Sequence, residues 1–195
     1  LASFTIRRDG SSRFGKNNRY GSFPAATLGY RLSKNLKANW LDDLKIRASW
    51  GKTGNQEIAN NARYGLYVAD YGQDRVTSTA YDLYRQGTGV FPSGFRATQT
   101  ANENLKWETT IQYNVGVDFS MFNQALYGTV DGYIKDVKDM LISPAFLGAM
   151  GEGGNMWSNG PSLRNIGMEA SVGYRHTTSY GLRYDVNANV DFFRN

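Results

Sequence analysis

The sequence predicts an all-β fold in which antiparallel up-and-down strands form a partial segment of a large transmembrane β-barrel. The first observation is the composition, because 22 Gly, 13 Tyr and 10 Phe against 4 Pro in 195 residues suit strands joined by turns. The second is a strict alternation of apolar and polar residues over segments of about ten residues. The third is that the connections between these segments alternate in kind along the chain, with long loops at every other connection and tight turns between them.

The composition narrows the class of protein further. The chain has no cysteine, which excludes disulfide frameworks and thiolate metal sites. A mean hydropathy of -0.51 and the lack of an apolar run near ~20 residues exclude a transmembrane helix, whereas a strand crosses a bilayer with about 9–11 residues. The formal net charge of +5 comes from basic residues spread among acidic ones. We therefore expect a solvated polar surface and no nucleic-acid partner.

Residues 109–135 show the clearest pattern in the chain. Apolar residues occupy every second position over residues 111–119, with polar residues or glycine between them. A similar alternation resumes over residues 126–134. If the connecting turn is Asn123-Gln124, apolar residues meet apolar residues across the ladder. The segment therefore predicts an antiparallel hairpin with one apolar face and one polar face.

The other strands follow the same rule. A change of phase near Ala26 and Thr27 predicts a bulge in the second of them. Tight turns at Asn123-Gln124 and around Tyr180 separate the closest strands. The sequence predicts about seven strands, which cover residues 2–7, 23–32, 44–51, 111–120, 126–135, 166–175 and 182–192.

Two long loops interrupt the alternation, at about residues 52–104 and 143–165, and both are rich in Gly, Asn and Ser. Consecutive antiparallel strands send every other connection to the same end of a sheet. The long loops then share one end and the tight turns share the other, as in outer-membrane barrels. The alternative is a soluble β-sandwich, such as a carbohydrate-binding module, in which the apolar faces would pack together. The sorting of the loops favours the barrel.

Two groups of residues are candidates for function. On the polar strand faces, a barrel would direct side chains into a wet lumen. On the long loops, exposed aromatics could stack on sugars or other ligands, or could instead pack the loops together. The lumen-lining candidates are Arg47, Asn114, Asp118, Asp131 and Glu169, and the loop aromatics are Tyr64, Tyr67, Tyr71 and Trp157.

No motif in the chain predicts an enzyme. Gly51-Lys52-Thr53 is similar to the end of a phosphate-binding loop, but Ile46 stands where that loop needs glycine and no helix pattern follows. His176 is the only histidine, so a histidine-based metal site or a serine-histidine-acid triad finds no support. We expect no catalytic residue, no metal and no cofactor.

Several segments in order resemble barrel strands of SusC/RagA-type TonB-dependent outer-membrane transporters of Bacteroidetes. The resemblance runs over nearly the whole chain and is weakest in the two long loops. It is carried by RRDGSSRFGKNNRYGSFPAATLGYRLS, WLDDLKIRASWGKTGNQ, ENLKWETTIQYNVGVDFSMFNQALYGTVDGYIKDVKDML and NIGMEASVGYR.

This resemblance implies a barrel of about 22 strands, a plug domain and import of glycans, oligosaccharides or peptides across the cell outer membrane. It also implies TonB, acting through the plug region, and a SusD-like lipoprotein as partners. The pattern contains no plug and too few strands for a closed barrel of that size. We therefore expect residues 1–195 to be part of one barrel domain with the plug absent. No substrate residue is carried over from the family.

Overall fold

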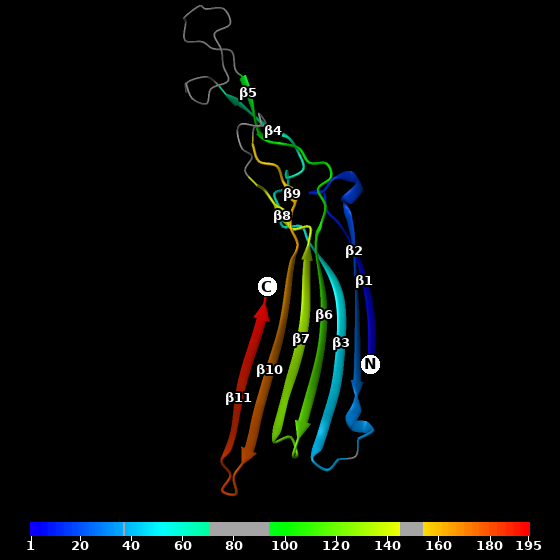
Figure 1. Cartoon of the computed structure of the whole chain (residues 1–195), viewed down its shortest axis with the longest axis vertical. Helices are drawn as coiled ribbons and strands as arrows, with labels where there is room; N and C mark the ends of the chain where they lie inside the picture. The colour runs from blue at the N-terminus through cyan, green and yellow to red at the C-terminus, as the bar shows by residue number, and fades with distance from the viewer. Residues whose placement is uncertain (37, 71–93, 145–153) are drawn as a thin grey trace, which may run out of the picture.

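The computed structural model describes residues 1–36, 38–70, 94–144 and 154–195. Its main element is a single antiparallel sheet of seven strands in the order β1-β2-β3-β6-β7-β10-β11 (Figure 1). Within this sheet, strands that follow one another in the chain lie side by side. Two small two-stranded sheets, β4-β5 and β8-β9, lie beyond one end of it. Among the described residues, no helix is long and apolar enough to cross a membrane.

The strands of the large sheet coincide with the seven predicted segments, and most extend further. Polar residues at the strand ends continue the ladder where alternation is no longer visible in the sequence. The strands are β1 Ala2–Gly10, β2 Tyr20–Arg31, β3 Leu41–Asn55, β6 Glu108–Met121, β7 Leu126–Lys138, β10 Leu163–Thr177 and β11 Arg183–Arg194. The short elements are η1 Lys16–Asn18, η2 Leu32–Lys34, β4 Leu66–Asp70, β5 Gly94–Gln99, β8 Leu141–Ile142 and β9 Ser158–Asn159.

The pairing register keeps one face of the sheet apolar and the other polar across all seven strands. Side chains of adjacent residues point to opposite faces, and cross-strand partners share a face. One row of apolar-face partners is Ala2, Leu28, Ala48, Val115, Gly132, Met168 and Phe192. The adjacent polar-face row is Gly29, Arg47, Gly116, Asp131, Glu169 and Asp191.

The apolar face is exposed and no second sheet covers it in the described part of the chain. Val115 is 58% exposed, Val190 65% and Phe192 71%. A soluble sandwich buries such a face against a partner sheet. The sandwich alternative is therefore wrong for this chain, and a wall of a larger barrel accounts for the single layer.

The length of the apolar band along a strand suits a strand that crosses a membrane. On β7, apolar residues or glycine occupy the apolar face from Leu126 to Ile134, and Asp136 follows at the next position on that face. At roughly 3.3 Å per residue, this span is about 26 Å long. A tilted strand needs about 9–11 residues to cross the hydrocarbon of a bilayer, and the span from Leu126 to Ile134 reaches the lower end of that range.

The band also runs obliquely to the ladder rows. Trp50 on β3 and Ile166 on β10 share the last apolar row at the loop end of these two strands. The partner of Ile166 on β11 is Arg194, so the band on β11 ends one step earlier, at Phe192. On β11 it continues toward the turn end as far as Tyr184. Such a shift is expected when strands are tilted in a barrel wall.

The hairpin of β6 and β7 has the predicted register. Ala125 donates its N–H to the carbonyl of Phe122 at 3.2 Å, and the ladder begins at the next pair. Asn123 and Gln124 have φ values of 55° and 65°, as a type I′ turn requires at both central positions.

The predicted bulge near Ala26 and Thr27 is wrong. The register of β2 is continuous with both of its neighbours, and the irregularity lies between Leu41 and Asp43 on β3. The change of phase has another cause. Phe23 lies on the polar side of the sheet, where it packs into the loop core described next.

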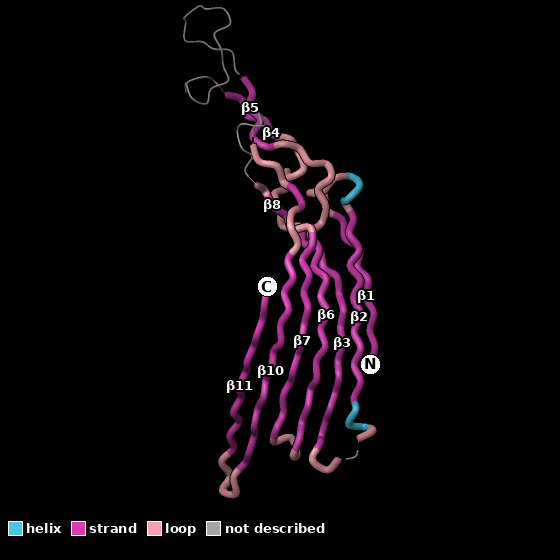
Figure 2. Tube along the Cα trace, viewed as in Figure 1, coloured by secondary structure: helices cyan, strands magenta, loops and turns pink. Residues whose placement is uncertain are grey.

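The connections are sorted as predicted (Figure 2). The two long loops, between β3 and β6 and between β7 and β10, lie at one end of the sheet with the shorter β1–β2 connection, and the two tight turns lie at the other end with the β2–β3 connection. The long loops begin and end at other residues than predicted, since strands reach Asn55 and start again at Glu108 and Leu163. A buried apolar core lies among the loops. It consists of Phe14, Phe23, Ile58, Ala62, Leu105 and Trp107, with Leu141 and Trp157 packed against it.

Candidate functional site

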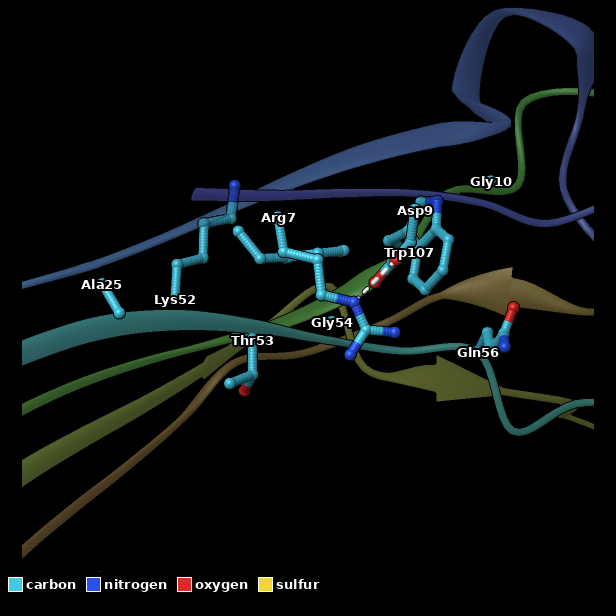
Figure 3. Close-up of a pocket in the computed structure, with 10 residues that line it drawn as sticks. Arg7, Asp9, Gly10, Ala25, Lys52, Thr53, Gly54, Gln56 and Trp107 are labelled. Atoms are coloured by element: carbon cyan, nitrogen blue, oxygen red, sulfur yellow. Dashed lines mark hydrogen bonds and ion pairs between the residues drawn. The ribbon is translucent and has the colours of Figure 1, made fainter. Parts of the chain in front are cut away.

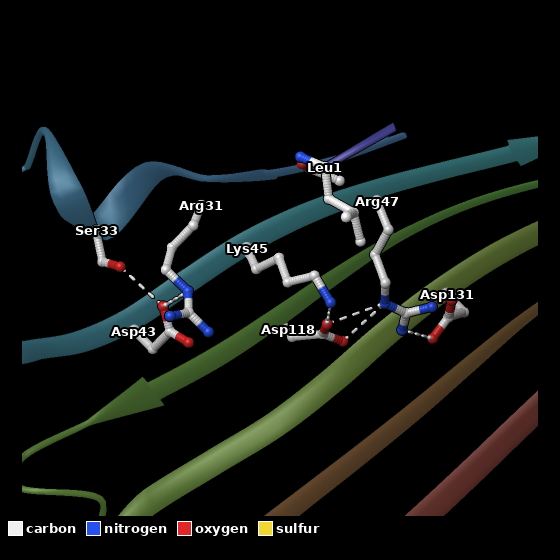
Figure 4. Close-up of polar contacts among 9 residues, drawn as sticks. Leu1, Arg31, Ser33, Asp43, Lys45, Arg47, Asp118 and Asp131 are labelled. Carbon is white, nitrogen blue, oxygen red and sulfur yellow. Dashed lines mark hydrogen bonds and ion pairs between the residues drawn. The ribbon is translucent and has the colours of Figure 1, made fainter. Parts of the chain in front are cut away.

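Arg47 is the centre of a charged cluster on the polar face (Figure 4). Its Nε donates to both carboxylate oxygens of Asp118, at 2.9 and 3.0 Å, and its Nη2 donates to Oδ2 of Asp131 at 2.8 Å. Lys45 lies 3.6 Å from the Asp118 carboxylate. Two cations and two carboxylates thus join β3, β6 and β7 into one balanced network.

The cluster depends on a glycine at its middle. Gly116 on β6 is the cross-strand partner of Arg47 on one side and of Asp131 on the other. A Cβ atom at this position would contact both the guanidinium group and the Asp131 carboxylate. The bare backbone of Gly116 therefore leaves room for the Arg47 side chain to cross β6.

Beyond Asp131, the same ladder row becomes acidic. Glu169 is the partner of Asp131, and Asp191 is the partner of Glu169. Carboxylates directly opposite each other repel, and the Arg47 guanidinium hydrogen-bonds only to the first of these three. A shallow pocket of about 340 Å³ lies over the three carboxylates. This part of the polar face therefore presents negative charge to solvent.

A second polar network lies near the turn end of the sheet. The Tyr127 hydroxyl lies 2.7 Å from Oδ1 of Asp185 and 2.8 Å from Oδ1 of Asn187. Arg175 donates to Oδ2 of the same Asp185 at 2.9 Å. Tyr127 crosses above Gly173, its own ladder partner on β10, to reach β11. As with Arg47, a glycine allows one side chain to span three strands.

A pocket of about 440 Å³ lies at the loop end, where β2 and β3 separate (Figure 3). The ladder between these strands ends at the pair Ala25 and Gly51. Arg7 and Asp9 form an ion pair of 2.7 Å at the pocket, and Trp107 lines it from the loop core. Its mixture of charged, polar and aromatic groups suits a polar ligand.

The whole chain, residues 1–195, matches the family model described as TonB dependent receptor-like, beta-barrel. The chain belongs to this family of TonB-dependent receptor-like β-barrels. Proteins of the family are outer-membrane β-barrels, and the sheet described above is a segment of such a barrel.

Relatives place the chain more closely within the TonB-dependent receptors. It is 37% identical over 201 residues to TonB-dependent receptor SusC of Bacteroides thetaiotaomicron, an alignment that covers all of this chain and 19% of SusC. It is 33% identical over 198 residues to TonB-dependent receptor P39 of Formosa agariphila, covering 96% of this chain and 17% of P39. The chain therefore spans about a fifth of the length of these relatives.

Solved structures agree with the sequence relatives. The RagAB peptide transporter superposes with a TM-score of 0.82 at 27% identity, covering 99% of this chain and 20% of that one. The RagAB peptide importer in its 'open-open' state gives a TM-score of 0.81, also at 27% identity. The resemblance of this TonB-dependent receptor segment to SusC/RagA-type transporters is confirmed.

The five predicted polar-face residues lie on that face in the barrel segment. Arg47, Asp118 and Asp131 are brought together in the ion-pair cluster, and Glu169 lies beside Asp131. Asn114 is separate from it, opposite Ser49 on β3. The residues that sequence reasoning missed are the ones that join strands, such as Gly116 and Tyr127. The sequence can reveal these residues only when the strand register is known, because each of them then lies opposite a charged or a small residue.

The predicted loop aromatics fall into different surroundings. Tyr67 on β4 is 69% exposed, and Tyr64 is exposed beside Arg63, whose guanidinium carbon lies 4.3 Å from the ring centroid. Trp157 packs against the loop core, which was the alternative role expected of these residues. Tyr71 lies outside the described residues.

The described residues include candidate metal ligands and the single histidine of the chain. No group of three His, Cys, Asp or Glu among them is placed to hold a metal ion. The ring of His176 stacks on Tyr174 at a centroid distance of 6.3 Å. What the arrangement can do is hydrate and hold polar solutes along one face of the sheet.

Proposed function

We propose that this chain is a wall segment of a TonB-dependent outer-membrane transporter that imports glycans, oligosaccharides or peptides. The observation that carries the proposal is the division of a seven-stranded sheet into an exposed apolar face and a charged face. A single sheet with such faces is stable where lipid covers one side and water fills the other.

In this proposal, the apolar face meets lipid and the polar face lines the lumen. Arg47, Asn114, Asp118, Asp131 and Glu169 then keep the substrate path hydrated. The long loops lie outside the cell, and the tight turn at Asn123-Gln124 lies on the periplasmic side. The full pairing of backbone groups between neighbouring strands supports this placement, since unpaired groups are costly in hydrocarbon.

The segment itself acts passively, as part of one barrel domain, and carries no catalysis. Energy for import comes through TonB and a plug domain located elsewhere in the protein, and a SusD-like lipoprotein covers the loop end. The SusC relative and the RagAB structures support these assignments. Because the solved relatives are named as peptide transporters, peptides stay in the proposed range beside glycans and oligosaccharides.

Substrate capture is assigned to the loop end. Exposed aromatic rings bind sugar rings and apolar peptide side chains by stacking and burial. Tyr64 and Tyr67 are exposed there, which supports such a role. Tyr71 and Trp157 remain proposed contacts of the same kind, although Trp157 also packs against the loop core.

Uptake by living cells tests the proposal. The full-length protein is produced in the outer membrane of a strain that lacks its own copy, and uptake of labelled oligosaccharides and peptides is measured with and without TonB. We expect uptake of at least one substrate class, and its loss when TonB is removed. Uptake that persists without TonB, or a parent protein that is folded and monomeric in water without detergent, would contradict the proposal.

A further inference from the structure

The pocket at the loop end is a groove that lies over β2 (Figure 3). Arg7 and Asp9 of β1 line one side of it, and Thr53 of β3 and the following Gln56 line the other. Between these two sides, the polar face of β2 carries Ala25, whose side chain is short. A small side chain between two strands with longer polar ones leaves a hollow of about 440 Å³.

The large side chain of β2 at this place, Phe23, forms the floor of the groove. Its ring lies where a Cβ atom on Gly21 of β2 or on Gly54 of β3 would be. The ring centroid lies 5.3 Å from that of Trp107, and both rings are buried. The Phe23 ring therefore closes the gap between β2 and β3, where their ladder has ended, and leaves the hollow above it open.

Paired strands flank the groove on both sides. β1 stays paired with β2 as far as Gly10 and Tyr20, and β3 is paired with β6 beside the groove, at Thr53 and Thr110. The outer edge of β1 lies on the far side of that strand from the groove. A further strand at that edge would therefore lie behind the wall of the groove and outside its hollow.

Several polar groups of the groove are held in place by the protein itself. Nε of Arg7 donates to Oδ1 of Asp9 at 2.7 Å. The carbonyl of Gln56 accepts hydrogen bonds from Nη1 of Arg13 at 2.7 Å and from the N–H of Ile58 at 2.8 Å. Groups that are already fixed lose little conformational entropy when a ligand binds.

The chemistry of these groups fits a sugar better than a peptide. The Gln56 amide and the Thr53 hydroxyl each donate and accept hydrogen bonds, as the hydroxyl groups of a sugar do. Asp9 accepts and the Arg7 guanidinium donates. The two aromatic rings at the floor are buried, so an apolar peptide side chain would find little surface to cover.

The groove also has an excess of positive charge. Arg7 and Lys52 are its two cations, and Asp9 is its single carboxylate. The Arg7 guanidinium gives its Nε to Asp9, and its two Nη groups can donate to a second carboxylate. Uronic acids are sugars that carry such a carboxylate beside their hydroxyl groups.

We propose that this groove is a binding subsite for a uronic-acid unit of an acidic oligosaccharide. Arg7 and Lys52 bind the carboxylate, and Thr53 and Gln56 bind the hydroxyl groups. The inference rests on the proposed function, because it takes the polar face to line the lumen and the loop end to face the outside. The groove then lies at the outer end of the lumen, where a substrate enters.

Binding to the purified full-length transporter in detergent, measured by isothermal titration calorimetry, tests this inference. The probes are the trimers of galacturonic acid and of mannuronic acid, each compared with its neutral counterpart, the trimer of galactose or of mannose. The test variants are Arg7→Gln and Gln56→Ala. Both side chains are exposed, so neither substitution should unfold the barrel.

The matched controls are Arg31→Gln and Gln112→Ala, which lie on the polar face outside the groove. Arg31 forms an ion pair of 3.1 Å with Asp43, as Arg7 does with Asp9. The control therefore breaks the same kind of pair on the same sheet.

We expect at least one acidic trimer to bind about tenfold more tightly than its neutral counterpart. Arg7→Gln should abolish this preference, because the neutral trimer has no carboxylate to lose. Arg7→Lys, which keeps the charge, should retain part of it. Gln56→Ala should weaken acidic and neutral trimers alike, by about threefold or more. The two control variants should bind as the wild type does.

Four results would overturn the inference. They are equal affinity of the wild type for acidic and neutral trimers, no binding of either acidic trimer, and losses in the controls equal to those in the test variants. The fourth is a triglutamate peptide that competes with the acidic trimer and depends equally on Arg7. In that case the groove recognises a carboxylate without the sugar.

Uptake by cells keeps the two proposals apart. TonB-dependent uptake of any oligosaccharide or peptide, together with no preference for acidic trimers, rejects this inference alone. Acidic trimers that bind the purified protein through Arg7, while no substrate enters cells in a TonB-dependent way, reject the proposed function and leave the groove as a binding site.

Discussion

Two glycines in the β6–β7 hairpin occupy opposite faces of the sheet. Gly116 lies on the polar face between Arg47 and Asp131, whereas Gly132 lies on the apolar face with open space where a Cβ would be. We expect Gly116→Ala to displace the ion pair and lower the free energy of unfolding by about 1 kcal/mol. Gly132→Ala should raise it by about 0.5 kcal/mol or leave it unchanged. Denaturant unfolding of the full-length protein in detergent measures both, and similar effects at the two positions would contradict the assigned role of Gly116.

Adjacent residues on β6 test which face meets lipid. Val115 lies near the middle of the apolar band, and Asn114 lies on the polar face. Placing arginine at the bilayer midplane of a barrel costs about 2–4 kcal/mol, whereas lumen positions accept charge. Val115→Arg should therefore reduce the amount of folded protein in the outer membrane, and Asn114→Arg should leave it close to the wild-type amount. Equal tolerance of the two substitutions, measured by membrane fractionation, would refute the assignment of faces.

Single residues also show what local sequence can predict. The alternation placed each side chain of the hairpin on its correct face, because the strand period depends only on neighbouring residues. The ion pair between Arg47 and Asp118 joins residues 71 positions apart in the sequence. Its prediction needs the register between β3 and β6, which the long intervening loop leaves undetermined.

At the scale of elements, the loop core holds three connections together. Trp107 is 7% exposed, its ring centroid lies 5.0 Å from that of Phe14 and 5.3 Å from that of Phe23, and its Nε1 donates to the carbonyl of Arg19. Sequence patterns missed this core, because its members come from separate polar segments without periodicity. The change of phase that follows Phe23, which was interpreted as a bulge, was the one feature of the local sequence that pointed to this core.

Removing the Trp107 side chain should make the loops less ordered and leave the barrel folded. Replacing a buried Trp with Ala destabilises the folded state by about 3–5 kcal/mol. Here the destabilised part is the loop core, which packs beyond the end of the sheet. We expect Trp107→Ala to speed protease cleavage of the long loops in the full-length protein, with no change in its detergent-resistant folded barrel. Tyr67→Ala is the control, since Tyr67 is largely exposed. Equal cleavage rates in the two variants would show that the core does not order the loops.

At the scale of the whole molecule, the sheet has the features of one part of a larger barrel. Its apolar face is exposed, its buried core lies among the loops, and the strands at its two edges, β1 and β11, are each paired on one side only. Loop sorting and face alternation predicted this architecture, because both follow from connectivity and period. The tilt of the apolar band could not be predicted, since it depends on the register of every strand pair.

Residues 1–195 produced alone should therefore not form a water-soluble monomer. Two open strand edges and an exposed apolar face favour pairing between copies, by the same backbone hydrogen bonds that join the strands within the sheet. We expect size-exclusion chromatography in detergent-free buffer to show aggregates, while the full-length protein in detergent elutes as a defined species. A folded monomer of the isolated segment in water, with the strand content of the sheet, would mean that its apolar face finds a partner within these residues. In that case neither lipid nor further barrel strands would be needed to explain the fold.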